Sequence, residues 1–151
     1  MATEADHLVL ANKNHQALLH LVPRPEDFSE WIATIAFYKA LQVVEAVFVR
    51  RGYRASDHNR RFELLKTSFP EIYRHFRVLW QASTIARYLH DNESNRSYSQ
   101  FSDYLSPARV VEKLVFRRLR PIEELAVSHL SEAGRQALVR VPAGAADQLS
   151  R

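Results

Sequence analysis

The chain is 151 residues long and carries a formal net charge of +4, with 46% hydrophobic and 25% charged residues. This length suits one domain with a sizeable core, and the composition is that of a folded protein rather than a disordered one. Because the sequence has no cysteine, it excludes disulfides, thiolate catalysis, iron–sulfur clusters and cysteine-ligated zinc. Its 3 glycines are far apart, so no glycine-rich loop is present to hold a nucleotide phosphate.

The positive charge is concentrated in the middle of the sequence. Residues 1–49 sum to −3, residues 50–120 to +8 and residues 121–151 to −1, and 17 of the 21 basic residues are arginines. Arginine suits bidentate contacts with phosphate and stacking on bases, so RNA or DNA is one candidate partner. Solvated helix faces that carry ion pairs explain the same pattern equally well.

We expect a soluble cytoplasmic protein without a membrane contact. No uninterrupted apolar run approaches the roughly 18–20 residues that a membrane-spanning helix needs. The first residues also lack the basic start and apolar core of a signal peptide.

The hydrophobic pattern is helical almost throughout. A first helix is predicted over about 3–21, before a proline-containing break. A second is predicted from a cap at Ser29 to about Arg50, with Gly52 as its stop signal. The second helix is apolar nearly all round, so it is predicted to be the central, most buried one.

A third and a fourth helix are predicted to follow closely on each other. The third begins after the caps Ser56 and Asp57 and ends near Ser68. The fourth begins at Pro70 and extends to about His90. The inward stripe of the third helix is predicted to consist of His58, Phe62, Leu65 and Phe69.

The remaining third of the chain is predicted to be less regular. Residues 91–100 are polar and are expected to form an exposed loop. A fifth helix is predicted from Ser106 to Arg120, and Pro121 is expected to break or kink it before a weaker sixth helix that ends near Val139.

The fold class that follows is all-α. No segment alternates with a period of two, so a β-sheet is not expected. We predict one domain over residues 1–140, an up-and-down bundle of four core helices with one or two additional C-terminal helices, and a disordered tail over 141–151.

A polar stripe runs along the apolar second helix, formed by Thr34, Tyr38, Gln42 and Glu45. A buried, unpaired carboxylate at Glu45 would cost several kcal/mol, so it needs a partner, for which Arg61, His58 and Arg87 are candidates. Tyr38 and Glu45 are therefore assigned to a polar core. An internal ion pair that fixes the helix register and a role in a functional site both remain open.

Aromatic and basic residues alternate along one face of the fourth helix. The face consists of Tyr73, Arg77, Trp80, Thr84 and Arg87. It could stack bases and neutralise phosphates, or contact a second copy of the chain. It could also be the edge of the core, covered by the aliphatic stems of the arginines.

The histidines show no tight metal-binding spacing, so no metal site is predicted. His15 and His58 both fall on apolar stripes, where a hydrogen-bonded core histidine is the usual explanation. His58 also lies near Arg54, Arg60 and Arg61, and neighbouring guanidinium groups favour a neutral imidazole that could act as a base. Metal-free RNA cleavage needs such a base for the 2′-hydroxyl and a cation for the charged phosphorane.

Three segments resemble bacterial HEPN-type proteins, the superfamily named for nucleotide-binding domains of higher eukaryotes and prokaryotes. Trp31–Ala46 resembles their central helix, and Asp57–Arg61 and Ser83–Leu89 resemble the motifs that follow it. The first helix with its proline-containing break also fits, so the resemblance covers about residues 5–90.

This resemblance implies a four- or five-helix up-and-down bundle that forms a homodimer. Many members are metal-independent ribonucleases of toxin–antitoxin, abortive-infection or CRISPR-linked defence systems, whereas inactive members bind nucleotides or partner proteins. The catalytic motif is an arginine followed by a histidine, with four to six residues between them. Arg51 and His58 fit that spacing, and the subgroup's pattern adds Arg61.

Two hypotheses follow. In the first, the chain is an RNA-directed, dimeric endoribonuclease in which His58 is the general base and Arg51 or Arg61 stabilises the transition state. Its substrate would be held by Arg54, Tyr73, Arg77, Trp80 and Arg87. In the alternative, the chain is a non-catalytic module that dimerises and binds a nucleotide, a nucleic acid or a partner protein such as an antitoxin. Neither hypothesis requires a cofactor.

Overall fold

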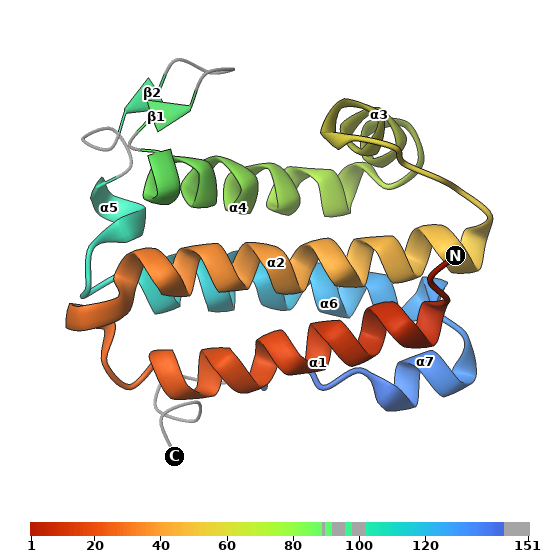
Figure 1. The fold of residues 1–151 in the computed structure, drawn as a ribbon, viewed down its shortest axis with the longest axis horizontal. Helices are drawn as coiled ribbons and strands as arrows, with labels where there is room; N and C mark the ends of the chain where they lie inside the picture. The colour runs from red at the N-terminus through yellow and green to blue at the C-terminus, as the bar shows by residue number, and fades with distance from the viewer. Residues whose placement is uncertain (89, 92–95, 98–101, 144–151) are drawn as a thin grey trace.

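The bundle is arranged around one long central helix, α2 (Pro25–Arg51). Helix α1 (Glu4–Leu21) lies along one side of α2 and α4 (Pro70–Tyr88) along the other (Figure 1). The π-helix η2 (Val111–Leu119) and α6 (Arg120–Ala126) run behind α2 and contact both α2 and α4. This arrangement confirms the predicted all-α helical bundle. The structure is a computed structural model that describes residues 1–88, 90–91, 96–97 and 102–143.

Shorter elements close the two ends of the bundle. Helix α3 (His58–Ser68) packs against α4 and is seen nearly end-on in Figure 1. The others are β1 (His90–Asp91), β2 (Arg96–Ser97), α5 (Ser102–Leu105), the 3₁₀ turn η3 (Val127–His129) and α7 (Glu132–Ala137).

The boundaries of α2 follow from its proline and its glycine. Pro25 occupies the start of the helix, where its missing N–H costs no hydrogen bond. The helix therefore begins earlier than the expected cap at Ser29, and Phe28 leaves helical geometry (φ −129°, ψ 20°) where the first turn joins the rest. At the other end Gly52 adopts φ 82°, a left-handed conformation that glycine tolerates best, and stops the helix as predicted.

Helix α3 begins where the sequence predicted, but its buried face differs. The Asp57 side chain accepts a hydrogen bond from the Arg60 backbone N–H and caps the helix. Leu64 and Leu65 are its buried residues, whereas His58 is exposed. The prediction that His58 lies on the inward stripe is wrong, because α3 packs on α4 at the end of the bundle rather than along α2.

Pro121 does not break the C-terminal helix, since Leu119 (φ −65°, ψ −50°) and Arg120 (φ −56°, ψ −48°) before it keep right-handed helical dihedrals. The preceding helix η2 is π-wound, so the Arg120 N–H donates to the Val115 carbonyl five residues earlier. In an α-helix the proline ring would meet the carbonyl of Arg117. The wider π turns relieve that clash, and α6 continues the rod with Pro121 in its first turn.

Two other expectations for the C-terminal third need correction. Residues 90–91 and 96–97 pair as a short antiparallel ladder, where the fourth helix was expected to end at about His90 and a loop to follow over residues 91–100. Val141, placed by the prediction in a disordered tail, is buried, and its N–H donates to Glu123 at 3.2 Å. The rest of the predicted loop and residues 144–151 lie outside the described residues.

The core of the bundle is built mainly on α2, as its composition predicted. The fully buried aromatic residues of α2 are Phe37 and Phe48, and the centre of the Phe37 ring lies 5.5 Å from that of Phe76 of α4. By length and composition α2 would also suit a membrane, but 67% of its most apolar window is buried by the rest of the chain. That burial is typical of the core helix of a soluble protein.

A buried ionic cluster joins the C-terminal segment to α1 and α2. Lys39 Nζ lies 3.0 Å from Glu123 Oε1, 2.8 Å from His15 Nδ1 and 2.8 Å from the Val139 carbonyl oxygen. The side chains of Lys39 and Glu123 are both fully buried. Burial lowers the pKa of Lys39 and raises that of Glu123, and the attraction between the two charges opposes both shifts. The cluster thus holds the segment after α7 against the bundle.

Candidate nucleic-acid interface

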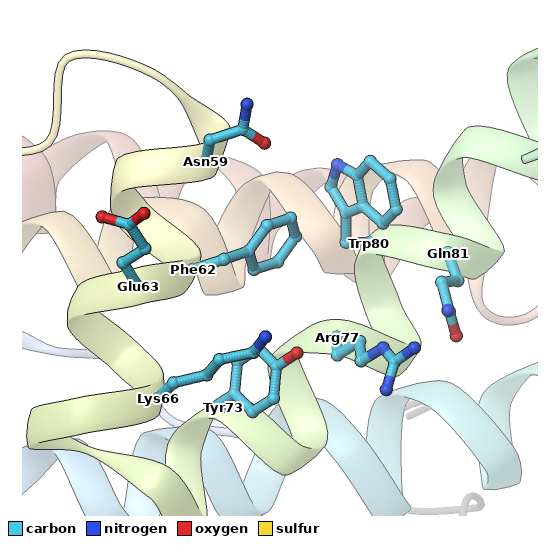
Figure 2. A pocket seen from close by; sticks show the side chains of 8 residues that line it. All are labelled: Asn59, Phe62, Glu63, Lys66, Tyr73, Arg77, Trp80 and Gln81. Carbon is cyan, nitrogen blue, oxygen red and sulfur yellow. The ribbon is translucent and has the colours of Figure 1, made fainter. Parts of the chain in front are cut away.

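A hollow of about 420 Å³ lies between α3 and α4. Figure 2 shows Phe62 and Lys66 of α3 directed toward Trp80 and Tyr73 of α4. We call it the aromatic hollow; it is lined by Asn59, Phe62, Glu63, Lys66, Tyr73, Arg77, Trp80 and Gln81.

Its wall consists of aromatic rings that meet edge to face. The Phe62 ring lies 5.2 Å from Trp80 at an interplanar angle of 88° and 6.1 Å from Tyr73 at 84°. All three side chains are partly buried, so their positions are fixed by packing while part of each remains accessible. Lys66 Nζ lies 5.3 Å from the Tyr73 ring centre, which adds a cation to the wall.

A second, larger depression of about 890 Å³ lies between α4 and η2. We call it the arginine groove; it is lined by Tyr73, Arg74, His75, Arg77, Val78, Gln81, Arg117 and Arg118. No carboxylate is among these residues. The two depressions share Tyr73, Arg77 and Gln81, so they form one continuous surface across α4.

The four arginines of the groove are only partly neutralised. Arg74 lies 3.4 Å from Glu71, and Arg117 lies 2.7 Å from Glu112. Within the described part of the chain, no carboxylate lies in ion-pair distance of Arg77 or Arg118. The groove therefore carries about two uncompensated positive charges, which favour an anion.

One buried polar atom of this surface has no partner among the described residues. The Nε of Arg118 is buried and makes no hydrogen bond. Gln81 lines both depressions and is largely buried. Buried polar groups in proteins are almost always hydrogen-bonded, so the unpartnered Nε of Arg118 points to an external partner in the groove.

His75 lines the arginine groove. Its Nδ1 lies 3.5 Å from Arg118 Nη1, a long contact. Burial lowers the pKa of His75, and the charges of Arg118 and Arg74 lower it further. The free protein therefore keeps this imidazole neutral near pH 7, and a bound anion would favour its protonation.

His58 and Arg61 meet at the start of α3, near the aromatic hollow. Arg61 Nη1 lies 3.0 Å from His58 Nδ1, and Arg61 Nε donates to Glu45 Oε1 at 2.7 Å. The His58 ring lies 6.4 Å from the Trp80 ring. Because an arginine only donates, Nδ1 of His58 is the acceptor in this contact, and a neutral ring carries its proton on Nε2.

The other residues predicted for the site lie apart from this surface. Arg51, at the end of α2, lies close enough to His129 to lower its pKa, after the larger effect of burial. Arg54 lines a separate depression near the N-terminus. Arg87 donates to the Tyr38 hydroxyl at 3.2 Å and stacks on that ring, so the structure assigns both residues to a contact between α4 and α2.

Of the predicted site residues, Tyr73, Arg77 and Trp80 line the aromatic hollow. Sequence reasoning missed the groove residues of η2, Arg117 and Arg118. The positive charge of residues 50–120 indicated that basic residues gather somewhere in this region. No pattern in the sequence indicated that η2 packs beside α4. No group of three metal-ligating side chains occurs among the residues that the structure describes.

Comparisons with known proteins give no relative for this chain. No protein-family model, no curated protein and no solved structure matches it.

Proposed function

We propose that the chain binds single-stranded RNA across the aromatic hollow and the arginine groove. The observation that carries the proposal is their continuity, since Tyr73, Arg77 and Gln81 belong to both depressions. Proteins that bind single strands combine aromatic rings, on which bases stack, with cations that follow the phosphates. Here the rings lie on α3 and α4 and the cations of the groove on α4 and η2, so α4 carries both.

The chemistry of the surface favours an unpaired strand over a duplex. In a duplex the bases are stacked on each other, and their flat faces are not available to Trp80 or Tyr73. The amide of Gln81, which lines both depressions, offers both a donor and an acceptor, which suits the edge of a base or a ribose hydroxyl. Stacking on aromatic rings is worth about 1–3 kcal/mol per base and tolerates different sequences.

The two tryptophans of the chain make a direct binding assay possible. Trp80 lines the hollow, whereas Trp31 lies at the start of α2 and is 60% exposed. A Trp31→Phe variant leaves Trp80 as the only reporter, and we expect single-stranded RNA to quench its fluorescence. In the matched Trp80→Phe variant, the remaining Trp31 should report no change. Absence of quenching in the Trp31→Phe variant would contradict binding at this surface.

A charge-matched pair of variants tests the role of the cations. Arg77→Gln removes an arginine shared by both depressions, and Arg135→Gln removes an exposed arginine of α7, which contacts α1 and η3. Affinity for a labelled single strand should fall about tenfold for Arg77→Gln and less than twofold for Arg135→Gln. The slope of log K against log salt should also decrease by about 0.7 for Arg77→Gln only. An equal decrease in affinity for both variants would indicate that the strand is attracted only by the net charge of the protein.

Cleavage of the bound RNA is a second candidate, favoured by the contact between His58 and Arg61. In this reaction a base removes the 2′-hydroxyl proton, the 2′ oxygen attacks phosphorus, and the bond from phosphorus to the 5′ oxygen breaks as that oxygen takes a proton from water. A substrate phosphate would compete with His58 for the Arg61 guanidinium. The transfer of Arg61 to the phosphate releases Nδ1 of His58, which then accepts the 2′ proton.

Incubation with total RNA in EDTA tests this candidate. Wild type should cleave, His58→Ala should not, and Arg61→Lys should lose most activity while it keeps a positive charge. Sedimentation of the active species shows whether it is a homodimer. If His58→Ala cleaves as well as wild type, this mechanism is excluded. If the wild type binds without cleaving, the non-catalytic alternative holds.

A further inference from the structure

Most cations of the proposed RNA surface line the arginine groove: it has four arginines, whereas the aromatic hollow has Lys66 and shares Arg77 with the groove. A strand that crosses a surface presents one negative charge per phosphodiester, at regular intervals. In the groove, Arg77 and Arg118 together supply about two charges without a protein carboxylate in ion-pair distance. A phosphate monoester carries about −1.5 to −2 at pH 7, so its charge matches these two arginines better than that of a diester.

The groove also has the donors that a terminal phosphate requires. The guanidinium fork of arginine binds two phosphate oxygens at once, and Nε is one of the nitrogens that form it. In Arg118 this Nε is buried and unpartnered, and the side chain is partly buried on η2. His75 becomes a further donor when it is protonated.

We propose that the arginine groove binds the terminal phosphate of a single-stranded RNA whose adjoining bases stack in the aromatic hollow. This inference depends on the proposed RNA binding and adds to it that the protein recognises strand ends. Gln81 and Tyr73, which line both depressions, lie where the first nucleotide would pass from the groove to the hollow.

Oligonucleotides that differ only at their ends test the inference. Three labelled RNAs of one sequence carry a 5′-phosphate, a 3′-phosphate or hydroxyls at both ends, with the label placed internally. For wild type, one of the phosphorylated strands should bind about tenfold more tightly than the hydroxyl strand, and which one it is assigns the recognised end. Equal affinity for all three strands would overturn the inference while RNA binding itself remained.

Variants connect that preference to the groove. Arg118→Gln should reduce the phosphate preference to less than twofold, and Arg118→Lys should retain only part of it because an ammonium cannot bind two oxygens in a fork. Arg135→Gln, which makes the same charge change on α7, should keep the full preference. A full preference in Arg118→Gln would place terminal-phosphate recognition elsewhere and refute the inference.

Inorganic phosphate distinguishes failure of the groove from failure of RNA binding. At constant ionic strength, phosphate should shift the His75 imidazole signals in NMR spectra of wild type in a saturable manner, and not those of Arg118→Gln. If no RNA binds but this shift occurs, RNA binding is refuted and the groove is an anion site alone. If no shift occurs, the groove is not a phosphate site and the inference is refuted, whatever the RNA result.

Discussion

Replacement of Lys39 by methionine should be among the most destabilising single substitutions in this chain. The Lys39 side chain is fully buried and lies 3.0 Å from Glu123, and it also contacts His15 and the Val139 carbonyl. Methionine fills a similar volume without the charge. The variant therefore leaves the Glu123 carboxylate buried with no cation beside it.

Lys39→Met should lower the free energy of unfolding by about 3 kcal/mol at pH 7. Removal of one member of a buried ion pair costs about 3–5 kcal/mol. Protonation of the abandoned Glu123 limits that cost, because neutralising a carboxyl of ordinary pKa 4.5 at pH 7 takes about 3 kcal/mol, at about 1.4 kcal/mol per pH unit. A loss of about 3 kcal/mol corresponds to a decrease of about 6–12 °C in Tm for a chain of this size.

The decrease in the free energy of unfolding caused by Lys39→Met should depend on pH. Without Lys39, burial holds the pKa of Glu123 in the folded state above its unfolded value. The folded variant then binds more protons than the unfolded chain, so its stability falls as pH rises. The difference in unfolding free energy between wild type and Lys39→Met should therefore decrease by up to about 1.4 kcal/mol per pH unit as pH falls from about 7 to 5.

Urea denaturation followed by circular dichroism at pH 7, 6 and 5 measures both effects. The matched control is the double variant Lys39→Met with Glu123→Leu, which removes both charges and should recover most of the stability. Recovery will be incomplete because the Glu123 carboxylate also accepts a hydrogen bond from the Val141 N–H. A loss below about 1 kcal/mol for Lys39→Met at pH 7 would refute the argument, and so would a double variant less stable than the single one.

Three further substitutions test other parts of the fold by the same denaturation assay. Burial and the Lys39 charge lower the pKa of His15 from 6.5 to about 4, so wild type loses stability as pH falls through that range. His15→Gln should lose about 2 kcal/mol less than wild type between pH 6.5 and pH 5. Parallel plots of unfolding free energy against pH for the two proteins would contradict this. Gly52→Ala places a side chain at φ 82° with no atom within 4 Å, so a purely conformational loss of about 1–2 kcal/mol is expected, and no loss would contradict the left-handed cap. Asn12→Ala removes two hydrogen bonds, to the Ala137 carbonyl (2.8 Å) and from the Val139 N–H (2.9 Å), and should cost about 1–3 kcal/mol; an unchanged urea midpoint would show that these bonds do not hold the C-terminal segment.

Most of the fold could be predicted from the sequence because the helix signals are local. The capping side chain of Asp57, the proline at the start of α4 and the glycine after α2 all lie within a few residues of the boundary that they set. The expectation of a break at Pro121 was wrong because a proline reports only on α-helical geometry. The π winding of the residues before it accommodates the ring, and no sequence pattern indicated that winding.

The polar groups inside the bundle include more than the two residues that the sequence suggested. Glu45 pairs with Arg61, one of its expected partners, and Tyr38 accepts a hydrogen bond from Arg87; both Tyr38 and Glu45 are partly buried. The fully buried charge is Lys39, the only basic residue between residues 25 and 49 of the apolar second helix. That isolation was a usable signal, but its partner Glu123 is 84 positions away in the chain, so the pair could not be identified without the fold.

The candidate site could be predicted only where its residues share one helix. Tyr73, Arg77 and Trp80 follow helical spacing on α4, and the structure brings them together in the aromatic hollow. Arg117 and Arg118 come from η2, and their place beside α4 depends on how two helices pack at long range. Spacing along the chain therefore predicted the stacking face of the surface but not its arginine groove.

The polar contacts that hold the C-terminal segment and the residues that form the proposed interface lie on different sides of α2. The Lys39 cluster and the Asn12 contacts connect α1, α2 and the C-terminal segment, whereas the hollow and the groove lie on α3, α4 and η2 (Figure 1). Substitutions distant from each other and without shared partners have nearly additive effects. Arg118→Gln should therefore change anion binding with little effect on the urea midpoint, and Asn12→Ala should do the reverse. If both variants changed both properties, the groove would depend on the packing of the C-terminal segment.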